Sequence, residues 1–206
     1  MTVRNATISV LVFWTVFFFS LQPSRAVTGD EPMQQVKETV DKILAILADP
    51  QYGPEDKAEL KKQLIVSIVK DRFDFKEMSQ RTLASSWKKI NAEEQKTFID
   101  LFSKLLETTY INKIEQYSDE KIVYGAQEVR GDKAVVESSV IRSGVETPLV
   151  YRLKSDSAGK WFVYDVVIEG VSLVSNYRSQ FLGVMEKEKF AGLVARLEKK
   201  IAGLEE

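Results

Sequence analysis

Apolar residues recur every three or four positions through the first part of the chain, and this spacing predicts amphipathic helices. One stripe runs over residues 33–47 and a second over residues 60–69. Between them, Pro50, Gly53 and Pro54 predict a loop, because these residues interrupt helices and favour turns.

A longer helix is predicted over residues 92–116, preceded by short helices in the segment 71–90. Asn91 and Glu94 stand at the spacing of a capping box, in which each side chain bonds the backbone N–H of the other residue. The apolar stripe of this helix is broad, and its members are Phe98, Leu101, Phe102, Leu105, Leu106, Thr109, Tyr110 and Ile114. This is the strongest helical signal in the chain.

After residue 120 the spacing of apolar residues changes to two, which predicts strands. Four segments follow one another: KIVYGAQEVRG, KAVVESSVIRSG, ETPLVYRLKS and KWFVYDVVIEG. Short turns at residues 131–132, 143–144 and 157–159 separate them, which predicts an antiparallel meander. Two amphipathic helices, over residues 173–185 and 190–204, close the chain. This order indicates an α+β fold with helices on one side of a twisted sheet.

The last predicted strand, residues 160–169, is apolar on both faces and is therefore expected at the centre of the fold. Strict alternation places Phe162, Tyr164, Val166 and Ile168 on one side, and Trp161, Val163, Asp165, Val167 and Glu169 on the other. So much apolar surface either fills an ordinary core or lines a dry cavity for an apolar ligand. Periodicity alone does not separate these two interpretations.

The first 26 residues have the pattern of a secretory signal peptide. Arg4 lies in a positively charged start, the apolar run Ile8–Leu21 follows, and Ser24 and Ala26 are the small residues of a cleavage site. The alternative is an uncleaved anchor, but the run is shorter than the about 20 residues that span a membrane. We expect cleavage after Ala26 and a single mature domain over residues 27–206.

The composition excludes several classes of site. The chain has no cysteine and no histidine, which excludes disulfides, Ser-His-Asp triads, His-ligated haem and Cys/His zinc sites. No glycine-rich phosphate loop is present. Removing residues 1–26 takes away two arginines and no acidic residue, so the net charge of −1 becomes more negative. This balance argues against nucleic acid as a partner and against strong general attraction to anionic membranes.

A few acidic residues stand at positions that suggest chemistry. Asp71 and Asp74 lack the spacing of a calcium loop and are expected to flank solvent. Asp165 is the only acid inside the strongly apolar run, and a lone carboxylate can act as a general base. The simpler interpretation is an acid paired with Lys or Arg. No catalytic residue, metal or cofactor is therefore expected.

Several segments together resemble one family. They are the signal peptide, FDFKEMSQRTL with Trp87, FIDLFSKLLETTY in the long helix, VYDVVIEGVSLVSNYRSQF, and the closing KFAGLVARLEKKI. In these segments the chain resembles the MlaC family of periplasmic lipid carriers, also called toluene-tolerance auxiliary proteins. The stretch 165–172, followed by Tyr177, Arg178 and Phe181, is the most specific part. The chain has Glu188-Lys189 where the family often has a glycine before its last helix.

The resemblance implies an NTF2-like α+β fold, in which a curved antiparallel sheet of at least four strands and several helices enclose an apolar cavity. It implies a periplasmic protein, not an enzyme, that holds phospholipid acyl chains and shuttles them between an outer-membrane lipoprotein complex and an inner-membrane ABC transporter complex. Exposing acyl chains to water costs about 0.8 kcal/mol per CH₂, so a lipid needs a dry container to cross an aqueous space. A hopanoid or another apolar lipid is the alternative cargo.

Under this hypothesis one face of the strand 160–169 lines the lipid cavity. The expected wall residues are Phe102, Leu106, Tyr110, Val140, Leu149, Tyr151, Val166, Ile168, Val171, Leu173 and Tyr177. Arg178 is expected to meet a headgroup phosphate at the mouth, with a surface arginine as the alternative.

Two other functions stay open: an NTF2-like enzyme that uses Asp165 on a small apolar molecule, by fold analogy, and a structural or chaperone module whose apolar residues only fill a core.

Overall fold

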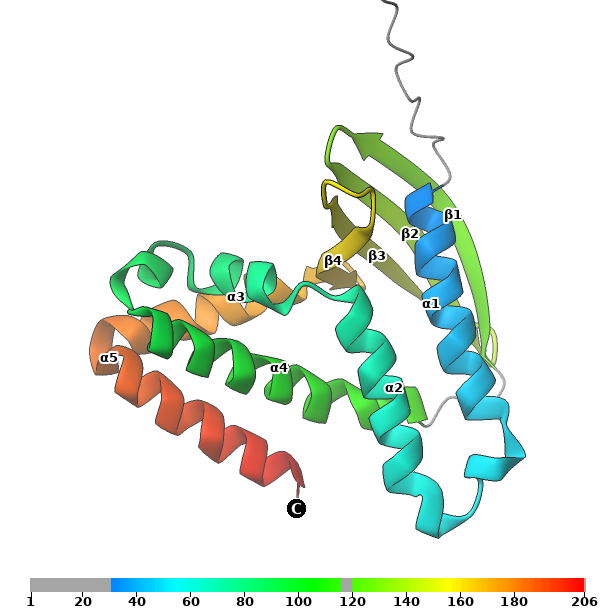
Figure 1. Ribbon diagram of the computed structural model, residues 1–206, viewed down its shortest axis with the longest axis horizontal. Coiled ribbons are helices and arrows are strands. Elements are labelled where there is room, and N and C mark those ends of the chain that lie inside the picture. The colour runs from blue at the N-terminus through cyan, green and yellow to red at the C-terminus, as the bar shows by residue number, and fades with distance from the viewer. Residues whose placement is uncertain (1–30, 116–119, 206) are drawn as a thin grey trace, which may run out of the picture.

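The structure, a computed structural model, describes residues 31–115 and 120–205 (Figure 1). The predicted signal peptide, residues 1–26, lies outside the described residues. The helices are α1 (Glu31–Ala48), α2 (Ala58–Arg72), α3 (Phe75–Leu83), α4 (Ala92–Glu115) and α5 (Leu173–Glu205), with 3₁₀ turns at Pro50–Tyr52, Glu55–Lys57 and Ala84–Lys89. The strands are β1 (Lys121–Arg130), β2 (Lys133–Arg142), β3 (Val145–Ser155), β4 (Trp161–Ile168) and β5 (Val171–Ser172). The predicted α+β fold is confirmed.

The strands form one antiparallel sheet in the order β1-β2-β3-β4-β5. Each strand pairs with its neighbour in sequence, as short turns require. The turns at Ser143-Gly144 and Glu169-Gly170 have positive φ at both central residues, which is the backbone of a type I′ hairpin turn. The second of these turns adds β5, a two-residue strand beyond the four that the spacing predicts.

Two apolar clusters lie in different parts of the molecule. Helix α1 lies across one face of the sheet (Figure 1), and its Val36 is buried with Val136, Leu153 and Trp161 of the strands. Helices α3, α4 and α5 form a separate layer, whose cluster includes Phe98 on α4. Helix α2 stands between the two parts (Figure 1).

Side-chain caps fix where the helices of the second layer begin. The N–H of Asn91 donates to Glu94 Oε2 and the N–H of Glu94 donates to Asn91 Oδ1, both at 2.9 Å, so the predicted capping box is present. Asp74 Oδ1 accepts from the N–H of Glu77 at 2.8 Å and caps α3. Asp74 is half-buried in this role, whereas Asp71 is exposed as predicted.

Strand β4 departs from the strict alternation that we expected. Residues 152 and 153 of β3 pair with Asp165 and Val163, so Tyr164 is an extra residue in β4. Such a β-bulge changes which side of the sheet the following residues face. Val163 and Val166 therefore lie in the same cluster, and the predicted division of residues 160–169 into two faces is wrong. The inner face carries Trp161, Val163, Val166 and Ile168.

Helix α5 consists of two helices joined by a kink at Lys189, which confirms the two predicted closing helices. The φ of Lys189 is 62° and its ψ is −168°, a backbone conformation that glycine adopts far more readily than lysine. Gly192 permits the close approach after the kink, because a Cβ on it would lie 2.3 Å from the Cβ of Glu188. A lysine therefore stands where the backbone favours glycine.

Candidate functional site

A cavity of about 560 Å³ lies between α1, α2, the sheet and the C-terminal half of α4. This volume is within the range of pockets that hold small molecules. The lining side chains are mainly apolar. They include Val36, Val40, Ile43, Leu44 and Leu47 of α1, Val66 and Val69 of α2, Leu106, Tyr110, Ile111 and Ile114 of α4, and Ile122, Val140, Leu149, Tyr151, Val163, Val166 and Ile168 of the sheet.

The apolar faces of the helices and of the sheet meet at this cavity. Apolar positions three and four apart on α1 share a face, and that face is turned toward the sheet. On the sheet, Ile122 pairs with Val140, and Leu149 pairs with Ile168, so inward residues form cross-strand rows. Many of these side chains are only half-buried. Covering such surface contributes about 25 cal/mol per Å², which favours an apolar ligand.

Eight of the eleven expected wall residues line this cavity. They are Leu106, Tyr110, Val140, Leu149, Tyr151, Val166, Ile168 and Leu173. Burial raises the pKa of Tyr110 and of Tyr151, so both hydroxyls stay neutral at physiological pH. These two residues add polar atoms to the wall without adding charge.

Phe102 and Tyr177, by contrast, lie in the cluster of the helical layer. Their ring centroids are 5.3 Å apart, and each ring also contacts Phe181. Phe102 is fully buried and Tyr177 is 4 % exposed. The expectation that they line the cavity is not met, because the stripe of α4 packs against α5 at Phe102 and reaches the cavity only from Leu106 onward.

Val171 and Arg178 also lie away from the cavity lining. Val171 follows the β4–β5 turn and is 56 % exposed. Arg178 Nε donates to the carbonyl oxygen of Arg81 at 2.7 Å, which ties α5 to α3. Arg178 is therefore not in position to meet a headgroup at this cavity.

The contribution of α1 and α2 was missing from the sequence-based set. Both helices were predicted from their stripes, and side chains such as Ile43 and Val69 now line the cavity. Their spacing carries no signal of this role, since a helix that covers a core and one that covers a cavity have the same periodicity.

Three of the six charged residues that line the cavity form ion pairs. Lys70 Nζ lies 3.5 Å from Glu107 Oε2, linking α2 to α4. Glu120 is 8 % exposed, and its Oε1 lies 3.4 Å from Arg142 Nε. These pairs leave the interior of the cavity largely apolar.

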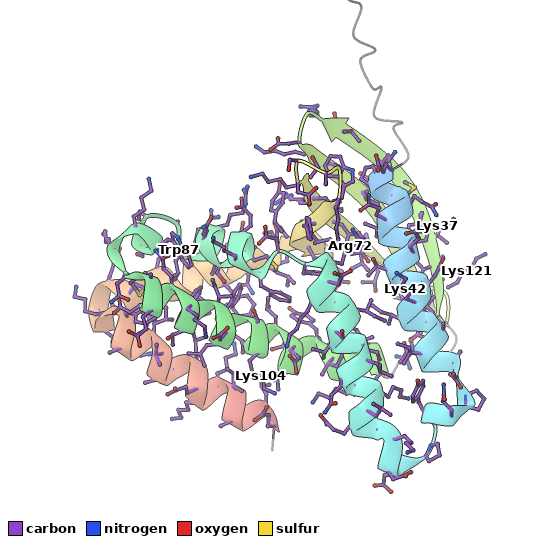
Figure 2. All side chains as sticks on the ribbon, in the orientation of Figure 1. Lys37, Lys42, Arg72, Trp87, Lys104 and Lys121 are labelled. Carbon is purple, nitrogen blue, oxygen red and sulfur yellow. The ribbon has the colours of Figure 1, made fainter. Side chains whose placement is uncertain are left out.

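A second hollow, of about 660 Å³, lies beside α2, α4 and the C-terminal end of α5. Its lining is largely ionic and includes Glu59, Lys62, Lys70, Lys104, Glu107 and Glu205. Lys104 lies between α4 and α5 (Figure 2), with its Nζ 2.9 Å from Glu205 Oε1. The Glu205 carboxylate raises the pKa of Lys104. Because acyl chains gain nothing from such a lining, the apolar cavity is the candidate lipid site.

Asp165 is buried but is not among the residues that line the cavity. Its Oδ2 accepts from Arg152 Nη1 at 2.9 Å and from Ser172 Oγ at 2.7 Å, and its Oδ1 accepts from the N–H of Val174 at 3.1 Å. The carboxylate thus caps the start of α5 and joins it to the sheet. The enzyme hypothesis requires this carboxylate inside a pocket, and the structure does not place it there.

Residues 31–115 and 120–205 contain no candidate metal cluster and no candidate membrane span. In this part of the chain, no group of three or more acidic side chains is placed to hold a metal ion. Within the same ranges, no helix has both the length and the apolar character needed to cross a membrane.

Comparison with known proteins gives the family. The profile of the family described as MlaC protein matches residues 37–199. The chain belongs to the MlaC family. The intermembrane phospholipid transport system binding protein MlaC of Haemophilus influenzae is 21% identical over 178 residues, which cover 84% of this chain and 83% of that protein. The resemblance expected from the motifs is thereby confirmed.

A solved structure supports the fold. The phospholipid-binding protein from Ralstonia solanacearum, in complex with a phospholipid, is 31% identical in sequence. It matches this structure with a TM-score of 0.74, over 84% of this chain and 98% of that chain.

Proposed function

We propose that this MlaC-family protein is a periplasmic carrier that holds phospholipid acyl chains in the cavity between α1, α2 and the sheet. The observation that carries the proposal is the cavity itself, about 560 Å³ and mainly apolar. It occurs in a fold whose solved relative from Ralstonia solanacearum is described in complex with a phospholipid. The eight sequence-predicted residues that line the cavity are proposed to contact the acyl chains.

The chemistry of the wall suits a carrier. Transfer of each CH₂ from water to an apolar surface contributes about 0.8 kcal/mol, so acyl chains bind without directional contacts. Binding of this kind tolerates different chain lengths and needs no reactive group. A passive carrier only equilibrates its cargo between two sites, so net direction would come from energy supplied elsewhere.

The proposed partners lie at both membranes. The mature chain, residues 27–206, would receive lipid at an outer-membrane lipoprotein complex and exchange it with an inner-membrane ABC transporter complex. Support comes from the secretory pattern of residues 1–26 and from the intermembrane transport system named for the Haemophilus influenzae relative. No cofactor or catalytic step is needed for this role.

The test is to identify what the protein carries. The mature chain is expressed in the periplasm of a bacterial host, purified without detergent, and its extracted lipids are analysed by mass spectrometry. We expect phospholipid in a fixed stoichiometry. A hopanoid would change the cargo and keep the carrier, whereas an empty protein that also takes no lipid from phospholipid vesicles would contradict the proposal.

A further inference from the structure

Arg72, the last residue of α2, lines the cavity at the C-terminal end of that helix (Figure 2). Three hydrogen bonds hold its guanidinium. Nε donates to Thr39 Oγ1 at 2.9 Å, and Nη1 donates to Gln35 Oε1 at 2.7 Å and to the Trp161 carbonyl oxygen at 2.6 Å. Because these acceptors belong to α1 and β4, the cation is fixed before any ligand arrives.

All three acceptors are neutral, so the charge of Arg72 is not compensated by them. Asp71 and Glu38 are the carboxylates whose fields raise the pKa of Arg72, but neither forms an ion pair with it, and Asp71 instead binds Lys160 at 3.0 Å. Burial has the larger effect and lowers the pKa of Arg72, although an arginine stays protonated at physiological pH. A half-buried cation without a direct ion pair is stabilised further when an anion reaches it.

The other cations of the lining differ from Arg72. Lys70 has its carboxylate partner on α4, and Lys113 is exposed to solvent beside the Tyr110 ring. In Arg72, Nη2 makes no hydrogen bond within the described residues, yet it is not sealed from accessible space. Its two N–H groups are the donors that an oxyanion would use.

We propose that Arg72 binds the anionic group of the lipid, a phosphate or a carboxylate, through Nη2. This proposal rests on the proposed function, since it requires a lipid in the cavity. Arg72 then takes the role that the sequence suggested for Arg178. Preorganisation by Gln35, Thr39 and Trp161 lowers the cost of binding the anion. The carrier would therefore prefer acidic lipids over neutral lipids with the same tails.

The test compares pairs of lipids that share the same tails, in which one member carries an anionic group and the other does not. The phosphate pair is phosphatidic acid and diacylglycerol, and the carboxylate pair is a fatty acid and its methyl ester. Their affinities are measured by displacement of a fluorescent single-chain probe from the intact mature protein. Each pair gives a ratio of affinities, acidic over neutral, in which any general effect on the cavity cancels.

For the wild type, we expect the acidic member of at least one pair to bind about tenfold more tightly, as one charge-assisted hydrogen bond provides. Arg72→Gln should bring that ratio close to one, whereas Arg72→Lys should keep a clear preference. The pair that responds identifies the anion as phosphate or carboxylate. Arg178→Gln is the matched control and should leave both ratios unchanged.

Two outcomes would overturn the proposal. A wild type that binds acidic and neutral lipids equally has no anion anchor, although the carrier function stands. If the acidic-over-neutral affinity ratio is unchanged in Arg72→Gln, even with weaker binding of all lipids, then Arg72 only links α2 to α1 and β4 and does not bind the anion. A wild type that binds none of the four lipids contradicts the proposed function itself.

A second measurement avoids variants that fail to fold. Phenylglyoxal modifies accessible arginines, and mass spectrometry of peptides reports the rate at Arg72 in the wild-type protein. We expect phosphatidic acid or the fatty acid to protect Arg72, and diacylglycerol or the methyl ester to protect it far less. Equal protection by the acidic and neutral members of both pairs would refute the contact.

Discussion

At the scale of single residues, Phe102 and Leu106 lie one turn apart on the same side of α4, but only Leu106 lines the cavity. The apolar stripe of α4 continues past the point where α5 stops covering it and the cavity begins. Sequence spacing predicts which face of a helix is apolar. It does not predict what covers each residue of that face, because the covering element is distant in sequence. Tyr177 was misplaced for the same reason.

Filling the cavity from the sheet should block lipid binding. Val140 lines the cavity, whereas Ile141, the next residue of β2, is not part of its lining and faces the other side of the sheet. We expect Val140→Trp to weaken phospholipid binding about tenfold, because the indole would occupy space that the acyl chains need. Overpacking a site of this kind costs about 1–3 kcal/mol. The check is displacement of a fluorescent lipid, with Ile141→Trp as the matched control. Equal loss in both variants would show that the effect is not specific to the cavity.

Removing the Asp165 carboxylate should destabilise the fold. Asp165→Ala leaves the N–H of Val174 without its acceptor at the start of α5 and frees Arg152. We expect the free energy of unfolding to fall by about 3 kcal/mol, measured by urea denaturation. Asp100→Ala, which removes a solvent-exposed i,i+4 pair, should change the midpoint little. If Asp165→Ala is as stable as the wild type, the carboxylate has some role other than this cap.

At the scale of elements, the capping box at Asn91 and the turns between strands could be predicted, because each depends on residues close in sequence. The bulge at Tyr164 could not be predicted, because it is defined by the pairing of β4 with β3. It reversed the expected facing of Trp161 and Val163, and so placed Val163 on the cavity side. A period of two in the apolar positions predicts that a strand exists. It predicts less securely which side of the sheet each residue faces.

The kink in α5 should be stabilised by placing a glycine at position 189. Lys189 has a φ of 62° and a ψ of −168°, a conformation that costs about 1 kcal/mol or more for a non-glycine residue. We expect Lys189→Gly to raise the free energy of unfolding by about 1 kcal/mol. Lys199→Gly, in the exposed interior of the second half of α5, should lower it by about 1 kcal/mol. Thermal unfolding of both variants is the check, and destabilisation by both would argue that no strain exists at Lys189.

At the scale of the whole molecule, the cavity is lined by members of two apolar clusters. Phe73 and Tyr110 contact both clusters and also line the cavity. A protein built only to fill a core would bring α1 and α2 against α4 and close this space. Helices α1 and α2 instead keep half-buried apolar side chains facing it. This arrangement could not be predicted from local patterns, since it depends on how the clusters sit relative to each other.

The most direct test of lipid binding in this cavity is photo-crosslinking with a phospholipid that carries a diazirine in the middle of one acyl chain. The probe is loaded into the mature protein, irradiated, and mapped by peptide mass spectrometry. We predict crosslinks on peptides of α1, α2, β3 and β4 that contain cavity-lining residues, and their loss in Val140→Trp. Crosslinks confined to the outer surface of α5, or unaffected by Val140→Trp, would contradict the proposal that the acyl chains lie in this cavity.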